Sequence, residues 1–159
     1  MDEKEKKVLV RLQNLCVRRE CCESDIYSKA LKAMEGDSDA ADRILKSLVE
    51  DKFISNLRYA SAYAREKASI SGWGSVKIRY MLAAKGVDSD TISEALEEID
   101  ETSANEILEK ILAAKYRMVA EDKDCKLKLL RYALGRGYNY EEVKSVVDDI
   151  IKSGGKNSL

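Results

Sequence analysis

The sequence predicts an all-α protein made of three tandem three-helix units, which we expect to stack into an elongated, curved helical-repeat array. The 159 residues include no proline, where average usage would give about eight. Apolar residues recur with helical spacing, and this pattern repeats at a fixed offset with a glycine before each copy. No stretch alternates apolar and polar residues between turn signals, so we expect no strands.

The repeat consists of three apolar quartets at positions i, i+3, i+4 and i+7, each the face of one helix. The quartets, 51 residues apart, are Ala41, Ile44, Leu45 and Leu48; Ile92, Ala95, Leu96 and Ile99; and Val143, Val146, Val147 and Ile150. Gly36, Gly86 and Gly137 precede them. Gly86 and Gly137 each follow a basic residue and are expected to end the preceding helices, with Asp88 and Asn139 capping the next ones. Asn139 and Glu142 have the spacing of a capping box. Such small units cannot bury an apolar stripe alone, so they should stack.

Each unit of about 50 residues has room for three short helices. The expected helices are 3–18, 24–34 and 39–51, then 56–70, 75–85 and 89–100, then 103–119, 124–135 and 140–152. The corresponding units are 1–54, 55–101 and 102–153, followed by a flexible tail at 154–159.

Composition excludes many kinds of chemistry. The chain has no histidine, which rules out Ser-His-Asp and Cys-His catalysis and imidazole ligation of zinc. Cys16, Cys21, Cys22 and Cys125 form no metal or disulfide pattern. We therefore expect no catalytic residues, no cofactor and no metal. No apolar run approaches the length of a membrane-spanning helix, and none has the pattern of the apolar region of a signal peptide. We therefore expect a cytoplasmic bacterial protein without membrane contact.

Charge is segregated along the chain, although the formal net charge is only −1. Residues 58–87 hold six bases against one acid, residues 88–109 hold nine acids and no base, and residues 110–136 hold eight bases against three acids. Blocks of this kind can steer an oppositely charged partner, or they can be ordinary solvated helix faces.

The sequence Gly72-Trp73-Gly74-Ser75 interrupts the helical pattern of the middle unit. Its glycines favour a helix–helix turn, with Trp73 packed inside the protein or facing a partner. The amides that open the next helix could instead hold a phosphate, but neither a Walker motif nor a dinucleotide fingerprint is present. Tyrosines interleaved with bases could also stack nucleobases, although at helical spacing they more often serve the core.

The segment from Ile44 through Asp100 resembles the RecX family, the bacterial regulators of the RecA recombinase. The resemblance rests on the order and spacing of short motifs. In the middle of the chain these are Leu48 to Ile54, Arg58-Tyr59-Ala60, the turn glycines with Lys77-Ile78 and Leu82, Lys85-Gly86-Val87, and the apolar pair Ile92 and Leu96. Farther on, Arg136-Gly137-Tyr138-Asn139-Tyr140 is similar to another family segment, and the match around Cys22 to Ala30 is weaker.

The resemblance implies three tandem three-helix units and a role without catalysis. It implies binding in the groove of the RecA–DNA filament, which limits filament extension. Inhibition of ATP hydrolysis, strand exchange and co-protease activity in DNA repair and the SOS response would follow. Family members can contact DNA and tend to be more basic than this chain. A pI near 5.7 shifts the expectation toward protein contacts, with single-stranded DNA only inside the filament.

Charge placement supplies the candidate contact residues of an expected monomer. The first surface is Arg58, Arg65, Lys77, Arg79 and Lys85, the second is Lys126, Lys128, Arg131 and Arg136, and Trp73 is an interface anchor. Two alternatives are a nonspecific nucleic-acid-binding helical module and a helical-repeat scaffold for another protein.

Overall fold

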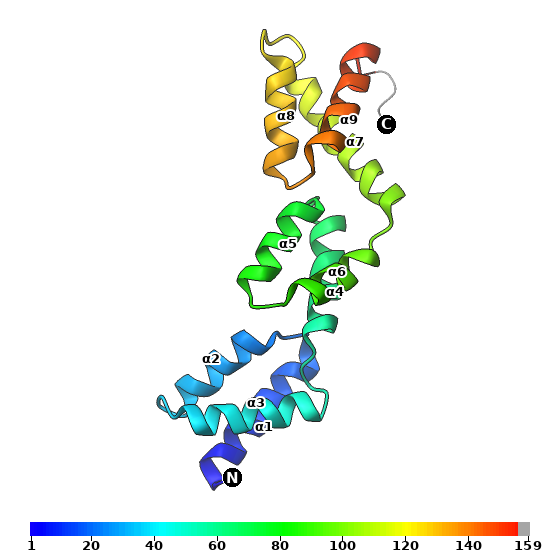
Figure 1. The fold of residues 1–159 in the computed structure, drawn as a ribbon. Helices are drawn as coiled ribbons and strands as arrows, with labels where there is room; N and C mark the ends of the chain where they lie inside the picture. The colour runs from blue at the N-terminus through cyan, green and yellow to red at the C-terminus, as the bar shows by residue number, and fades with distance from the viewer. Residues whose placement is uncertain (156–159) are drawn as a thin grey trace. The chain divides into compact units, whose positions relative to one another are not determined.

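A computed structural model describes residues 1–155, which form nine α-helices and contain no strand (Figure 1). The all-α prediction is therefore confirmed. The helices are α1 (Glu3–Arg18), α2 (Glu23–Ala33), α3 (Ser38–Glu50), α4 (Asn56–Ser69), α5 (Ser75–Ala84), α6 (Ser89–Glu97), α7 (Glu101–Val119), α8 (Cys125–Gly135) and α9 (Tyr140–Ser153). All nine expected helices are found, with ends that differ by at most three residues. Most of the expected tail at 154–159 lies outside the described residues.

Local signals in the sequence account for these helix ends. Gly36, Gly86 and Gly137 have φ angles of +89°, +81° and +94°, a left-handed conformation that glycine adopts without strain. Asp88 accepts a hydrogen bond from the amide of Thr91 at 2.8 Å. Asn139 likewise accepts one from the amide of Glu142 at 2.9 Å and caps α9. The predicted glycine stops and caps are confirmed.

Contacts group the chain into two compact units. Unit 1 comprises Met1–Tyr63 and Leu82–Ala95, and unit 2 comprises Ala64–Met81 together with the chain from Leu96 onward. The middle three helices therefore contribute to both units. The division into three units at residues 54 and 101 remains a prediction.

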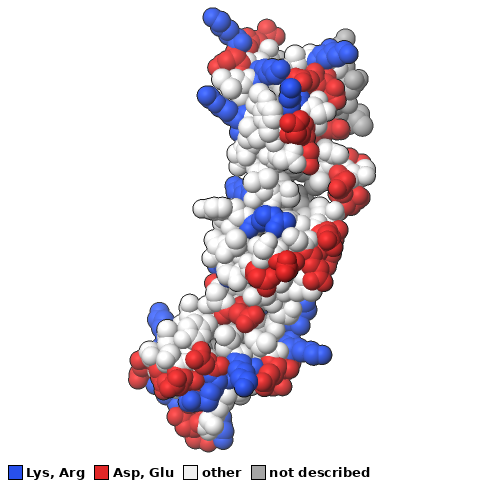
Figure 2. Space-filling view, viewed as in Figure 1, with Lys and Arg blue, Asp and Glu red and all other residues white. Residues whose placement is uncertain are grey.

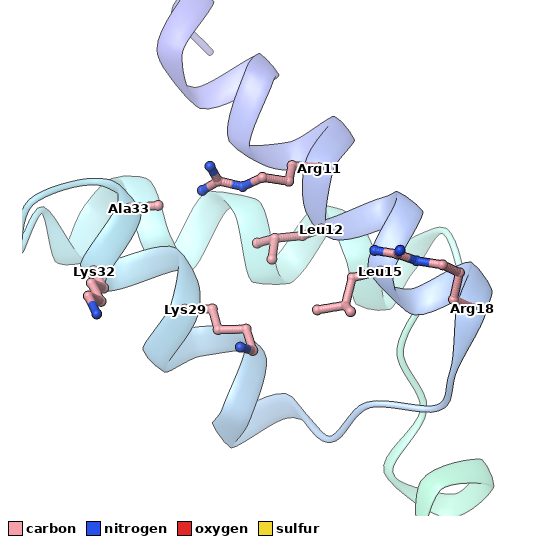
Figure 3. Close-up of a pocket in the computed structure, with 7 residues that line it drawn as sticks. All are labelled: Arg11, Leu12, Leu15, Arg18, Lys29, Lys32 and Ala33. Carbon is pink, nitrogen blue, oxygen red and sulfur yellow. The ribbon is translucent and has the colours of Figure 1, made fainter.

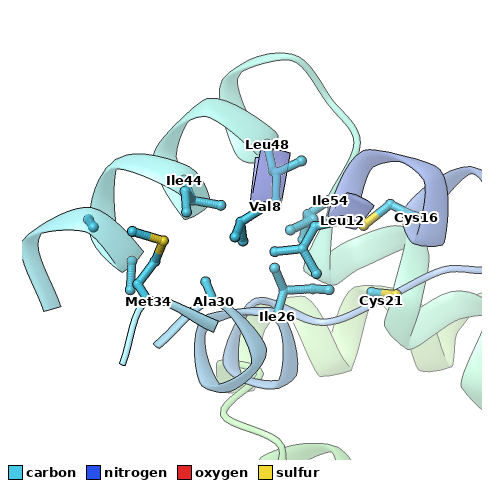
Figure 4. Packing of buried hydrophobic residues seen from close by; sticks show 12 residues of the cluster. Val8, Leu12, Cys16, Cys21, Ile26, Ala30, Met34, Ile44, Leu48 and Ile54 are labelled. Atoms are coloured by element: carbon cyan, nitrogen blue, oxygen red, sulfur yellow. The ribbon is translucent and has the colours of Figure 1, made fainter. Parts of the chain in front are cut away.

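In unit 1, the apolar faces of α1, α2 and α3 close around a core (Figure 4). Ile26, Ile44 and Leu48 are completely buried at its centre. The side chain of Glu5 is also buried, at 4% exposure. Its carboxylate accepts two hydrogen bonds from Arg43 of α3, at 2.6 and 3.1 Å. This bidentate pair joins α1 to α3 and satisfies the buried charge.

In unit 2, α7, α8 and α9 enclose a second core. Its fully buried members are Leu108, Leu112, Leu129, Ala133, Val143 and Val147. The turn between α4 and α5 is joined to the turn between α8 and α9 by backbone hydrogen bonds. The amide of Gly74 donates to the carbonyl of Arg136, and that of Val76 donates to the carbonyl of Gly137, both at 2.9 Å. These bonds fix the position of the Trp73 turn within unit 2.

Candidate functional site

Trp73 lies at the centre of a small cationic cluster in unit 2. Its ring is partly exposed, and its amide donates to the carbonyl of Lys67 at 2.9 Å. The ammonium nitrogens of Lys67 and Lys77 lie 4.9 and 4.3 Å from the ring centroid, within the range of a cation–π interaction. We call these three residues the Trp73 cluster. It presents an aromatic surface and two positive charges together, a combination suited to a protein or nucleic-acid partner.

The turn that carries Trp73 uses some of its amides within the fold. Two amides at the start of α5, those of Gly74 and Val76, already donate to the carbonyls of Arg136 and Gly137. A phosphate bound through these two amides would have to displace both bonds. The structure shows the expected helix–helix turn, and the two bonded amides disfavour phosphate binding there.

The five cations predicted for the first surface fall on both compact units. Arg58 and Lys85 belong to unit 1, where both make intramolecular contacts. Arg58 donates to the carboxylate of Glu20 at 3.1 and 3.2 Å and to the carbonyls of residues 52–53 at 3.0 and 3.3 Å. Lys85 contacts both carboxylate oxygens of Asp25 at 3.2 Å. Arg58 thus braces the end of α3, and both side chains are less available to a partner than their charges suggest.

The other three cations, Arg65, Lys77 and Arg79, belong to unit 2. Arg65 and Arg79 are exposed on α4 and α5. Arg65 pairs with Glu98 at 3.2 Å, and both side chains are largely in water. Exposed pairs contribute about 0–1 kcal/mol, so a partner can compete for Arg65. This trio and the Trp73 cluster are all drawn from residues 64–81.

In the second predicted surface, three cations are exposed on α8. Lys126 pairs with Asp148 at 3.1 Å and Lys128 with Asp122 at 2.7 Å. The hydrogen bond that Lys128 donates to Asp122 raises the pKa of Lys128 above its ordinary value. Arg131 has no ion pair with any residue from 1 to 155. Arg131 is therefore the most accessible charge of this surface.

Arg136, the fourth residue of that surface, is held inside unit 2. Its guanidinium donates to the carbonyl of Ser71 at 2.8 Å and to the hydroxyl of Tyr132 at 3.1 Å. The hydroxyl of Tyr138 donates to the next carbonyl, that of Gly72, at 3.1 Å. Burial raises the pKa of Tyr138 to about 12, so this donor stays protonated at neutral pH. Arg136 thus serves the fold of the Trp73 turn.

The acidic block is exposed along its length. All nine acids between residues 88 and 109 are exposed, and Figure 2 shows acidic side chains gathered near the turn between α6 and α7. Exposed acids repel the phosphates of nucleic acid. This part of the chain is better suited to a basic protein surface.

A basic cleft between α1 and α2 was missed by the sequence analysis. It has a volume of about 480 Å³ and carries four cations, Arg11, Arg18, Lys29 and Lys32 (Figure 3). The only signal in the sequence is that Arg11 and Arg18 share one helical face, as do Lys29 and Lys32. That signal does not reveal that the two faces meet across one cleft.

Within residues 1–155, no group of three or more acids and cysteines is arranged to hold a metal ion. In the same stretch, no helix is long and apolar enough to cross a membrane.

Comparison with known proteins finds similarity to a single family. Residues 55–96 match the family model described as "RecX, second three-helix domain". The chain is 31% identical to the regulatory protein RecX of Clostridium tetani over 137 residues, covering 84% of this chain and 62% of that protein. It is also 31% identical to the regulatory protein RecX of Clostridium acetobutylicum, covering 76% of this chain and 58% of that one. The chain thus spans about three fifths of the length of these relatives.

Two solved structures share the fold. The crystal structure of RecX from Lactobacillus salivarius superposes with a TM-score of 0.83 and 18% identity, over 94% of this chain and 98% of that one. A second crystal structure, of a regulatory protein RecX, gives a TM-score of 0.80 and 23% identity, over 95% of this chain and 72% of that one. The helical-repeat architecture predicted from the sequence is therefore confirmed.

Proposed function

This chain belongs to the RecX family, and we propose that it is a regulatory protein that binds the RecA recombinase on single-stranded DNA. In this proposal a monomer binds the filament in the bacterial cytoplasm and limits its extension. The ATPase, strand-exchange and co-protease activities of RecA in DNA repair and the SOS response fall as a result. The observation that carries the proposal is the match of residues 55–96 to the family's second three-helix domain, since this segment contains the Trp73 cluster.

Contact with the filament is proposed to run through Arg65, Lys77 and Arg79, with Trp73 as the anchor. These residues have the features of an interface hot spot, namely an aromatic ring beside charges that can exchange their partners. Lys67, at 4.9 Å from the same ring, adds to the positive charge. Arg131, Lys126 and Lys128 on α8 supply the second proposed contact.

No catalytic step is assigned to this chain, because the proposed effect needs only binding. A protein that binds one filament state better than another shifts the equilibrium by its difference in affinity. Chemistry carried out by RecA then slows because less active filament is present.

A nonspecific single-stranded-DNA module is the second candidate, favoured by Tyr80. This ring is 74% exposed beside Arg79 on α5, and exposed rings next to cations can stack bases. The nine exposed acids at 88–109 oppose this candidate. A steep fall of oligo-dT affinity with rising salt would favour it, because each phosphate contact releases counterions.

The test adds the purified chain to preformed RecA–ssDNA filaments and follows ATP hydrolysis. We expect inhibition that saturates as the chain is added. A Lys77→Gln, Arg79→Gln variant should need a roughly tenfold higher concentration, since two charge contacts of about 0.7 kcal/mol each give one decade. The matched control is Lys144→Gln, Lys152→Gln on α9, whose exposed side chains have no ion pair within residues 1–155.

Two results separate the function from the site. No effect of the unaltered chain at saturation would refute the proposed function. Undiminished inhibition by the Lys77, Arg79 variant would refute only the assignment of the surface.

A further inference from the structure

The basic cleft of unit 1 has the features of a binding site. Leu12, Leu15 and Ala33 form its apolar part, and Figure 3 shows both leucines pointing from α1 toward the space between the helices. Arg11 and Arg18 come from α1, and Lys29 and Lys32 come from α2. The volume of about 480 Å³ is within the range of pockets that hold small ligands or side chains.

All four cations of the cleft are exposed and unpaired. None of them forms an ion pair or a hydrogen bond through its side chain with any residue of 1–155. Elsewhere in unit 1, by contrast, Arg43, Arg58 and Lys85 each contact a carboxylate.

The lining of the cleft contains no acid that could balance these charges. Four like charges around one cleft repel one another. An anionic occupant would remove that repulsion and would gain four contacts.

We propose that the cleft binds an acidic peptide segment of a partner protein, with aliphatic side chains between its carboxylates. The apolar part of the cleft, formed by Leu12, Leu15 and Ala33, suits aliphatic side chains of the peptide. Arg and Lys on both sides suit its carboxylates, and guanidinium groups can bind them with two hydrogen bonds. No aromatic residue lines the cleft, so single-stranded nucleic acid would find no ring on which to stack its bases.

This site is separate from the function proposed above, because it lies in unit 1 and needs no recombinase. A direct binding assay can therefore test it alone. The probe is a fluorescein-labelled peptide of about 14 residues, roughly four helical turns. Leucines stand at i, i+3 and i+7 with glutamates elsewhere, and a scrambled peptide of the same composition serves as its control.

The variant to compare is Arg11→Glu, Lys29→Glu, which reverses one charge on each helix. The matched control is Lys123→Glu, Lys144→Glu in unit 2, where both side chains are exposed and unpaired within residues 1–155. Each substitution removes one positive charge and adds one negative charge, so the two substitutions of either variant change the net charge from −1 to −5. The comparison therefore separates local contacts from overall charge.

Fluorescence anisotropy should show that the unaltered chain binds the peptide, and that it binds the scrambled peptide less well. The cleft variant should weaken binding by roughly tenfold or more, because charge reversal replaces attraction with repulsion. The control should change it by no more than about twofold. If circular dichroism shows that the cleft variant does not fold, the neutral variant Arg18→Gln, Lys32→Gln replaces it. Its expected loss of affinity for the peptide is about threefold to tenfold.

Three outcomes would overturn the proposal. The first is no binding of the peptide to the unaltered chain. The second is an equal loss in the cleft variant and its control, which would show only a net-charge effect. The third is a loss of oligo-dT binding in the cleft variant while peptide binding is unchanged, which would assign the cleft to nucleic acid.

Discussion

Replacing Gly137 with alanine should unfold unit 2 far more easily than its place in a surface turn suggests. Gly137 follows α8 with a φ of +94°. A Cβ atom at this position would lie 2.2 Å from the Cβ of Lys77 and 2.6 Å from its backbone nitrogen. These distances are too short for atoms that are not bonded. The start of α5 would therefore have to move away from the turn between α8 and α9.

The cost of this movement has two parts. The left-handed backbone costs a residue with a Cβ roughly 1–2 kcal/mol. Separating the turns also breaks the hydrogen bonds from Gly74 to Arg136 and from Val76 to Gly137, both 2.9 Å long. Each contributes about 1 kcal/mol net. We therefore expect Gly137→Ala to lower the free energy of unfolding by about 3–4 kcal/mol.

Urea unfolding followed by tryptophan fluorescence measures this effect directly. Trp73 is the single tryptophan and belongs to unit 2. The matched control is Gly154→Ala at the end of α9, where φ is +63° and a Cβ would meet no atom within 4 Å. That variant should lose only the backbone part, about 1–2 kcal/mol. Equal losses in Gly137→Ala and Gly154→Ala would refute the argument that the two turns are in close backbone contact.

Three further predictions concern buried polar groups. Glu5→Gln should lower the midpoint of unfolding followed by far-UV circular dichroism, because it removes the charge that binds Arg43 through two hydrogen bonds; an unchanged midpoint would contradict this. Burial raises the pKa of Cys16 from 9.0 to about 11, so alkylation at this residue, followed by mass spectrometry, should stay slow until the pH nears 11. The raised pKa also contributes to the stability of the folded state below pH 9, and this contribution is lost as the pH rises toward 11. Fast labelling of Cys16 in the native chain at pH 8 would contradict the raised pKa. Tyr138→Phe removes the bond to the carbonyl of Gly72 and should cost about 1–2 kcal/mol in the urea titration above, whereas no loss would show that water replaces this bond.

The helices were predictable because their signals are local. Apolar quartets gave the core faces, and glycines gave the helix ends, since a left-handed φ is a property of one residue and its immediate neighbours. Gly137 shows where this reasoning stops. Its role as a helix stop follows from Arg136-Gly137, whereas its contact with Lys77 depends on how two distant turns pack.

The candidate site was harder to predict for the same reason. Charge placement identifies Arg58 and Arg136 as cations, but it does not show that carbonyls and side chains of the fold bind them. Conversely, Arg11 and Lys29 belong to helices whose faces meet only after packing. What already binds a charge in the folded chain therefore decides how available it is to a partner, and this follows from packing rather than from the sequence.

The length of RecA filaments on single-stranded DNA tests the central claim most directly. RecA is allowed to extend on long single-stranded DNA with and without the chain, and electron microscopy measures the filaments. The account predicts that filaments grown with the chain are shorter, and that the Lys77→Gln, Arg79→Gln variant needs a higher concentration for the same shortening. Filaments of unchanged length at a saturating concentration of the unaltered chain would contradict it.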